Sequence, residues 1–213
     1  MQADTTSEAL LGRIVKAAVS EVSGARYAGI TLVNARKVST PAATSELVER
    51  IDQIQYETGQ GPCLESAARH QTVRSDDLRE EARWPRFARR AADLGVVSML
   101  SVQLFAGAES FGALNIYAES AKAFGPDSES TGILLASHAA LAMAAARKEA
   151  NLLAAMDTRD LIGQAKGILV ERYKITGVQA FGLLVASSQS VNHKLRAVAE
   201  HLVATGELIT PPR

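Results

Sequence analysis

The sequence predicts an α+β fold in which an antiparallel sheet flanked by helices is followed by a long helix and a small helical unit. Three strand-like segments, Ala28–Asn34, Val96–Phe105 and Phe111–Tyr117, are interspersed with helical segments in the first part of the chain. The last two are joined by the short turn Gly107–Ser110, which suits an antiparallel hairpin. Strands mixed with helices and ending in a hairpin indicate an antiparallel sheet with helices packed on it.

Helical segments are expected within this first part. Apolar residues recur at helical spacing from Glu8 to Val22, so one side of this segment can pack on the sheet. A second helix is expected to open at Trp84–Phe87, which contains a proline, and to run to Leu94. The loop Gly59–Pro62 precedes it. The apolar side of the first helix consists of Leu10, Leu11, Ile14, Val15, Ala18 and Val22.

One uninterrupted helix is expected from about residue 130 to 172, with Asp127 or Ser128 as its cap. At ~1.5 Å per residue it would be ~65 Å long, which exceeds the width of a small domain, so much of it needs a partner. Residues that recur near a seven-residue period along this helix indicate a parallel two-stranded coiled coil. We therefore expect a homodimer through connector residues 128–160. The alternative is two shorter helices folded onto their own domain. The pattern consists of Leu134, His138, Leu141, Ala145, Leu152, Met156 and Leu169.

Two further helices are expected after this long one. Thr176 is a suitable cap for a helix over residues 178–190, and Asn192 for a helix over residues 193–205. Gly206 stands where a glycine commonly ends a helix. Apolar residues at helical spacing on both helices predict a small three-helix unit that includes the end of the long helix.

The composition restricts the class of protein. Hydrophobic residues make up 47% of the chain, which is enough for a packed core. The formal net charge is zero, so a nucleic-acid site would have to be local. We find no pattern of a signal peptide and no apolar run long enough to cross a membrane, so we expect no membrane partner. The single cysteine, Cys63, forms no internal disulfide, which fits a cytoplasmic protein.

Two glycines within the expected long helix are the most informative local feature. Gly163 and Gly167 lie one turn apart, and each costs about 1 kcal/mol relative to alanine. Such glycines usually permit the close approach of another backbone or a bound molecule. Arg159 and Lys166 share one stripe, with Gln164 beside it, and such a stripe suits phosphates and base edges. The alternative is that the glycines only let the last two helices pack tightly.

A second polar cluster, Ser187–Ser190 with Asn192–Arg196, lies between the last two helices. Its hydroxyls, its amides and Lys194 could contact an RNA backbone and unstacked bases. The alternative is that these residues only cap helix ends. Residues 157–213 contain seven Lys and Arg against five Asp and Glu, a basic surplus too small for strong nonspecific binding.

Three stretches in this region resemble the ANTAR domain in order and spacing. The resemblance implies a three-helix module at residues 157–206 that binds paired RNA stem-loops and prevents formation of a terminator. One difference is Val185-Ala186, where members often carry a more basic pair, so a less positive surface is expected. The stretches are Arg159-x-x-Ile-Gly-Gln-Ala-Lys-Gly-Ile-Leu169, Ala180-Phe-x-Leu-Leu184 and Ser187-Ser-Gln-x-x-Asn-x-Lys-Leu-Arg-x-Val-Ala-Glu200. The contacts that the resemblance implies are Arg159, Ala165, Lys166, Gly167, Ser188, Asn192 and Lys194, to which the stripe adds Gln164.

Residues 8–147 resemble a GAF sensor domain of the kind joined to ANTAR in actinobacterial regulators. This implies a small-molecule or protein signal at the sensor domain but does not identify it. A phosphorylated receiver domain is not expected, because no acidic pair follows the first strand. The stretches that carry the resemblance are Tyr56-Glu-Thr-Gly-Gln-Gly-Pro-Cys-Leu64, Asp77-Leu78, Arg83-Trp-Pro-Arg-Phe87 and Phe111-Gly-Ala-Leu-Asn-Ile-Tyr117.

The resemblance therefore implies an RNA-binding transcription antiterminator controlled by a sensor domain. The alternatives are a signalling module whose helical tail binds a protein, and an enzyme acting on a small molecule in the sensor pocket. We expect no enzyme, because no convergent catalytic set is found, and no cofactor or metal site, because the histidines lack metal spacing. Cys63, at the start of a helix, is a weak candidate for ligand binding, and the alternative is a buried structural thiol. His138 is expected to be packed or at an interface.

Overall fold

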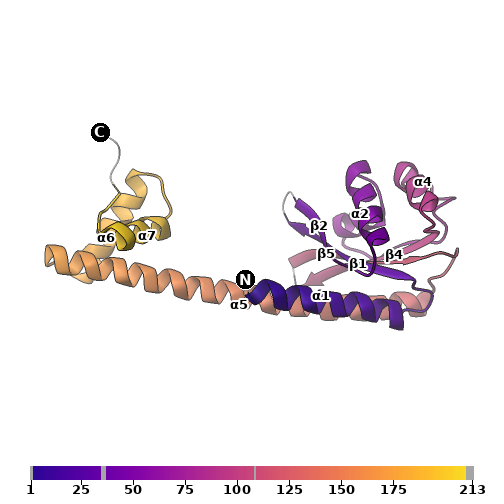
Figure 1. The fold of residues 1–213 in the computed structure, drawn as a ribbon, viewed down its shortest axis with the longest axis horizontal. Helices are drawn as coiled ribbons and strands as arrows, with labels where there is room; N and C mark the ends of the chain where they lie inside the picture. The colour runs from indigo at the N-terminus through magenta and orange to yellow at the C-terminus, as the bar shows by residue number, and fades with distance from the viewer. Residues whose placement is uncertain (1, 35–36, 108, 210–213) are drawn as a thin grey trace. The chain divides into compact units, whose positions relative to one another are not determined.

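The computed structural model describes residues 2–34, 37–107 and 109–209, with the side chains of residues 2–8, Asn34 and Lys37 left undescribed. The chain divides into two compact units, Met1–Arg147 and Lys148–Arg213. Helix α5, Pro126–Tyr173, begins in the first unit and ends in the second (Figure 1). Each unit has its own core and is described by itself.

A five-stranded antiparallel sheet forms the centre of the first unit. Its strand order is β2-β1-β5-β4-β3, so the β4–β5 hairpin lies in the middle of the sheet. Pro41 lies in the edge strand β2, where a residue without an N–H is tolerated. The strands are β1 Tyr27–Asn34, β2 Lys37–Ala43, β3 Val73–Ser75, β4 Ser98–Ala106 and β5 Glu109–Ala118.

Helices cover both faces of this sheet (Figure 1). Helix α1, Gln2–Glu21, and the first part of α5 cover one face, where Ile14, Ala139 and Ile116 belong to one buried cluster. Helices α2 Glu46–Thr58, α3 Pro62–Arg69 and α4 Pro85–Asp93 cover the opposite face. Because side chains alternate along a strand, both faces of β4 and β5 carry buried residues. The second cluster includes Val48, Ile51, Cys63, Phe87, Met99 and Tyr117.

The second unit consists of the end of α5, α6 Gly177–Ser190 and α7 Leu195–Thr205. Thr176 begins α6 with a capping box, in which its hydroxyl accepts from the N–H of Gln179 and its N–H donates to the Gln179 amide. Gly206 ends α7 in the left-handed conformation, φ 78°. The core of this unit consists of Ala165, Leu169, Ala180, Leu184, Val198, Ala199 and Leu202.

The structure confirms the expected fold class, the hairpin and the unbroken long helix, and it excludes two shorter helices in place of α5. Two expected caps are wrong. Helix α5 begins at Pro126, before Ser128, whose buried hydroxyl instead donates to the Ser23 carbonyl at 2.9 Å. Helix α7 begins at Leu195 with Lys194 as its cap, because Asn192 adopts a left-handed turn conformation, φ 52°. One residue of the hairpin turn, Ala108, lies outside the described residues.

Candidate nucleic-acid interface

The outer face of α5 in the second unit carries the two glycines. Gly163 and Gly167 are exposed, and a Cβ built on either would have no atom of another element within 4 Å. The interpretation that they allow tight packing of the last two helices is therefore wrong. Within this chain, the helix accepts two unfavourable residues without a packing benefit. The bare backbone that they leave is accessible to a partner.

Lys166 lies on one side of this face and reaches towards the start of α6. A Cβ built on Gly177, the first residue of α6, would lie 3.6 Å from its Cε and 3.7 Å from its Nζ. Arg159 is exposed two turns earlier on the same side of α5. The structure therefore places the two predicted cations on one flank of α5, and Lys166 lies beside the N-terminus of α6.

Gln164 lies on the other flank, contrary to its expected place beside the Arg159–Lys166 stripe. Two residues along a helix turn the side-chain direction by about 200°, so Gln164 and Lys166 point to nearly opposite sides. Gln164 and Gly167 instead belong to a groove of about 930 Å³ between α5 and α7. Its remaining lining residues are Ile168, Glu171, Arg172, Lys174 and Val203.

The two basic residues of this groove, Arg172 and Lys174, were not among the site residues predicted from the sequence, although both lie within one turn of the end of α5. Lys174 pairs with Glu171 at 2.5 Å. Arg172 donates to the carbonyl of Gly206. Both basic side chains of the groove thus already have partners within the chain. Their position at the end of a helix was the signal in the sequence that could have identified them.

Ala165 does not contribute to an exposed surface. Its side chain is fully buried in the core of the second unit, next to Leu169 in the same cluster. The RNA contact that the resemblance implies for Ala165 is therefore corrected: its side chain packs in the core. A small residue is suitable there because the three helices meet around it.

The turn between α6 and α7 contains the remaining predicted contacts. The Ser188 hydroxyl donates to the His193 carbonyl at 2.6 Å, so this side chain stabilises the turn. Asn192 is exposed in the left-handed conformation, which asparagine tolerates better than most residues. Lys194 is exposed at the N-cap of α7, where it makes no side-chain capping bond.

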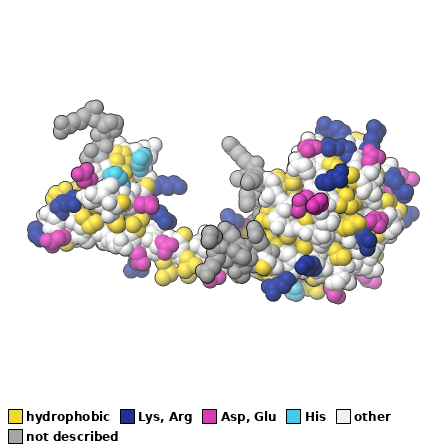
Figure 2. Space-filling model, viewed as in Figure 1, with side chains coloured by type: hydrophobic (Ala, Val, Ile, Leu, Met, Phe, Trp, Pro, Cys, Tyr) yellow, Lys and Arg dark blue, Asp and Glu magenta, His cyan; other side chains and the backbone are white. Residues whose placement is uncertain are grey.

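The charges around α6 and α7 share an unusual feature. Neither helix carries an acidic residue in its first turn. A lysine stands near the N-terminus of each one, Lys166 at α6 and Lys194 at α7. A helix N-terminus carries a partial positive charge, so a cation there is unfavourable until an anion joins it. Figure 2 shows basic and acidic side chains interspersed on the visible face of this unit, not one large basic patch.

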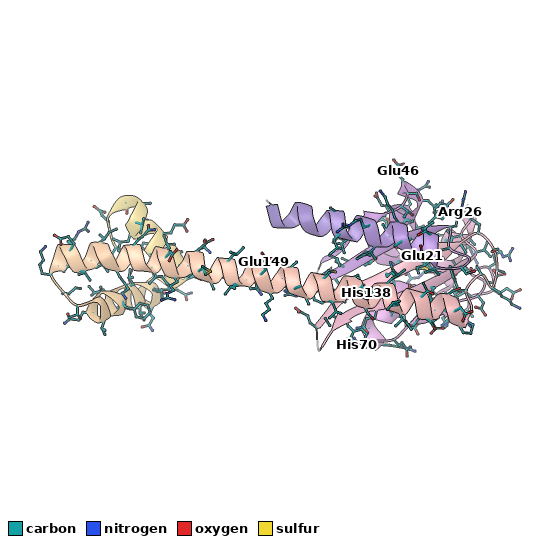
Figure 3. All side chains as sticks on the ribbon, turned by 90° about the horizontal axis from the view of Figure 1, so that it is seen from below. Glu21, Arg26, Glu46, His70, His138 and Glu149 are labelled. Carbon is teal, nitrogen blue, oxygen red and sulfur yellow. The ribbon has the colours of Figure 1, made fainter. Side chains whose placement is uncertain are left out.

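The first unit buries its cysteine. Cys63 is fully buried, and burial raises the pKa of its thiol to about 12. The helix start does not make it an accessible thiolate, so the weak ligand-binding candidate is unsuitable for direct contact with a ligand in this conformation. His138 on α5 is exposed, not packed (Figure 3).

In the part of the chain that the structure describes, no group of three or more His, Cys, Asp or Glu side chains could hold a metal ion. None of the described helices combines the length and the apolar character needed to cross a bilayer.

Solved structures similar to this chain are GAF domains and proteins of that fold. The blue-light absorbing form of the PixJ GAF domain from Thermosynechococcus elongatus is 13% identical, with a TM-score of 0.58, over 74% of this chain and 96% of that one. A GAF domain of a phosphoenolpyruvate-protein phosphotransferase from Coxiella burnetii is 17% identical, with a TM-score of 0.55, over 68% and 86%. Free methionine-R-sulfoxide reductase from Neisseria meningitidis is 18% identical, with a TM-score of 0.52, over 70% and 87%. At these identities the likeness shows the fold alone.

Family models give the most specific comparison, since no curated protein matches the chain. A GAF domain model matches residues 4–144, which is most of the first unit. An ANTAR domain model matches residues 150–203, which contain the two outward glycines of α5 and the lysines near the N-termini of α6 and α7. The chain therefore belongs to the GAF domain family and carries an ANTAR domain at its C-terminal end, the architecture of a GAF–ANTAR regulator.

Proposed function

We propose that this protein is a transcription antiterminator whose ANTAR domain binds paired stem-loops in leader RNA under control of the GAF domain. Two features of the ANTAR domain carry the proposal. Two glycines of α5 face open space, and a lysine lies near the N-terminus of each of the helices α6 and α7. Phosphate is the natural partner of such helix ends, because backbone N–H groups and the lysine ammonium both favour an anion.

The proposed contacts divide into two kinds. Lys166 and Lys194 bind phosphates beside α6 and α7, and Arg159 extends the basic flank along α5. The bare backbone at Gly163 and Gly167 lets an RNA loop approach the helix closely, and Gln164 offers an amide in the groove for a base edge. Asn192 is exposed in the α6–α7 turn, where its amide can contact RNA. Ser188 stabilises this turn through its hydrogen bond to the His193 carbonyl.

We further propose that two copies act together through α5. The predicted stripe is exposed as far as Met156: Leu134 is 57%, Leu141 61% and Leu152 63% accessible, whereas its last member, Leu169, is buried in the core of the second unit. His138 and Ala145, which belong to the same stripe, are exposed as well. An exposed leucine stripe on a long helix is typical of a coiled-coil seam. Two linked ANTAR domains would bind two stem-loops with higher apparent affinity than either domain alone.

The enzyme alternative receives little support from the residues. Methionine sulfoxide reductases share the GAF fold at low identity, which speaks for the fold and not for the activity. A thiol chemistry would need Cys63, which is buried and held as a thiol. We therefore infer that the GAF domain senses a signal, and that the ANTAR domain carries the output.

The test is binding of the full chain to a leader RNA with two hairpins. The variant Lys166→Ala with Lys194→Ala is expected to weaken binding at least tenfold and to reduce the dependence of log Kd on log salt, because two phosphate contacts are lost. Lys16→Ala is the matched control, since Lys16 is an exposed lysine on α1 of the first unit. The control should bind like the parent protein.

Equal affinity of the parent protein for the two-hairpin RNA and for a scrambled RNA would contradict the proposal. A double lysine variant that folds and binds like the parent would contradict the assignment of contacts. If the chain binds no RNA and its helical tail captures a protein instead, the alternative of a signalling module replaces the proposal.

A further inference from the structure

A closed ring of four oxygen atoms lies inside the GAF domain. The Asp52 carboxyl on α2 is fully buried, and its Oδ2 lies 3.1 Å from the Thr31 hydroxyl and 2.8 Å from the Thr40 hydroxyl. The Tyr56 hydroxyl lies 2.9 Å from Thr31 and 2.8 Å from Thr40. Each of the four oxygens thus contacts two others. The ring joins α2 to strands β1 and β2.

The other carboxyl oxygen, Oδ1, is already surrounded by donors. It accepts from the Gln55 amide at 3.3 Å, from the Asn115 amide at 3.4 Å and from the Tyr117 hydroxyl. None of these three groups takes part in the ring. The Asn115 amide also donates to the Thr31 hydroxyl at 3.0 Å, which occupies one of the two acceptor positions of that oxygen.

The number of protons decides the state of the ring. Four oxygen–oxygen contacts at hydrogen-bond distance require four protons, one in each contact. The hydroxyls of Thr31, Thr40 and Tyr56 supply one proton each. An ionised Asp52 supplies none, so one contact of the ring would join two oxygens without a proton between them. A protonated Asp52 supplies the fourth, and every contact becomes a hydrogen bond that runs in the same direction.

We propose that Asp52 is held as the neutral acid in this ring, and that loss of its proton opens the ring. The ring is thus a pH-dependent latch of the GAF domain, closed while Asp52 is protonated. The ring lies in the GAF domain, so its state does not depend on RNA binding. In the closed state Oδ2 donates to Thr40, Thr40 to Tyr56, Tyr56 to Thr31 and Thr31 back to Oδ2. Removing the proton leaves a buried negative charge and one contact that no proton occupies.

The surroundings of the carboxyl favour the neutral form. Burial raises the pKa of Asp52, against the opposing effect of its hydrogen bonds. The titratable groups that face it are Tyr56 on α2, Cys63 on α3 and Tyr117 on β5, and burial raises the pKa of each, so all three stay uncharged at neutral pH. None of the groups that shift the pKa of Asp52 is a cation, so no partner compensates its charge.

The ring is also connected to the start of α3. Gln55 donates to Asp52, and its amide oxygen accepts from the Cys63 N–H at 3.0 Å. Gly61 permits this contact, since its φ is 138° and a Cβ there would lie 2.3 Å from the Gln55 oxygen. Opening of the ring therefore acts on α2 and on the N-terminus of α3 together.

Infrared spectroscopy of the full chain at neutral pH tests the proposal. The parent protein should show one C=O band of a protonated carboxyl group, and the band should be absent from Asp52→Asn. The band should disappear on raising the pH, and the folding equilibrium constant should fall by up to about tenfold per pH unit between the pKa of Asp52 in the unfolded chain and its raised pKa in the folded protein. Asp52→Asn should lose this dependence.

The variant Tyr56→Phe distinguishes the ring from burial alone. Without the Tyr56 hydroxyl, Thr31 and Thr40 both have Oδ2 as their acceptor, which favours the carboxylate, so the band should disappear at a lower pH than in the parent. Burial alone predicts an unchanged or higher pH. The proposal is overturned if the parent lacks the band at neutral pH, or if Tyr56→Phe does not lower the pH at which it disappears. Since Tyr56→Phe keeps Asp52, this comparison holds even if Asp52→Asn fails to fold.

Discussion

At the scale of single residues, the glycines are the most informative residues of the ANTAR domain. Gly163, Gly167 and Gly182 all face open space on exposed helix surfaces, so alanine fits at each position without a clash. Alanine should stabilise the second unit by up to about 1 kcal/mol at each site, because glycine is the poorer helix former. The three positions differ in function, since only the first two lie on the proposed RNA surface.

We therefore expect Gly163→Ala with Gly167→Ala to raise the unfolding midpoint and to weaken RNA binding at least tenfold. Gly182→Ala on α6 is the matched control, which should raise the midpoint and leave binding unchanged. Urea denaturation and RNA titration measure the two effects. Loss of binding in both the double variant and the control, or in neither, would contradict the assigned surface.

Cys63 gives a second prediction at this scale. Its thiol is fully buried with a pKa raised to about 12, so the reactive thiolate is scarce at neutral pH. A maleimide reagent should label the native chain at least a hundredfold more slowly than the chain in denaturant. Labelling at equal rates in both conditions would show that the thiol is accessible, and would restore Cys63 as a candidate for ligand binding.

At the scale of elements, α5 is the feature that links the two units along the chain. Its leucine stripe is exposed in both of them, at Leu134 and Leu141 in the first and at Leu152 in the second. Exposed leucines at this spacing cost little in a monomer but stabilise a pair of helices. The stripe therefore predicts self-association, and the prediction belongs to the helix as a whole.

Leu152→Glu should convert a dimer into a monomer at micromolar concentration without loss of helix content, because the side chain is exposed within one copy. Ala150→Glu introduces the same charge at an exposed position off the stripe and should leave the dimer intact. Light scattering and circular dichroism provide the readouts. A monomeric parent protein would refute pairing through α5 in the absence of RNA.

Several elements were predictable from the sequence because their signal is local. The helical period of α1, the short turn between β4 and β5, and Gly206 after α7 each depend on neighbouring residues. Helix α2 was missed, although Leu47, Val48, Ile51 and Ile54 have helical spacing. Strand β2 was missed because Pro41 and small residues give it no clear alternation.

The candidate sites show the same division. The outward glycines were identified from the sequence, but whether they met another helix depended on tertiary packing, and the alternative of tight helix packing was wrong. The ring around Asp52 joins Thr31, Thr40 and Tyr56 across three elements, with Asn115 nearby from a fourth. No local spacing indicates contacts between residues so far apart in the chain.

At the scale of the whole molecule, a GAF domain and an ANTAR domain are joined in one chain with no net charge. The small basic surplus of the ANTAR domain makes a single site weak. We therefore propose that pairing of two sites supplies the affinity, and that the spacing between two stem-loops supplies the specificity.

The most direct measurement is a titration of the full chain against three RNAs at one salt concentration: a leader with two hairpins, the same leader with one hairpin deleted, and a scrambled sequence. The account predicts the highest affinity for the two-hairpin RNA, a loss of at least tenfold for the single hairpin, and a further loss for the scrambled RNA. Equal affinity for all three RNAs would contradict the central claim that paired ANTAR domains recognise paired stem-loops.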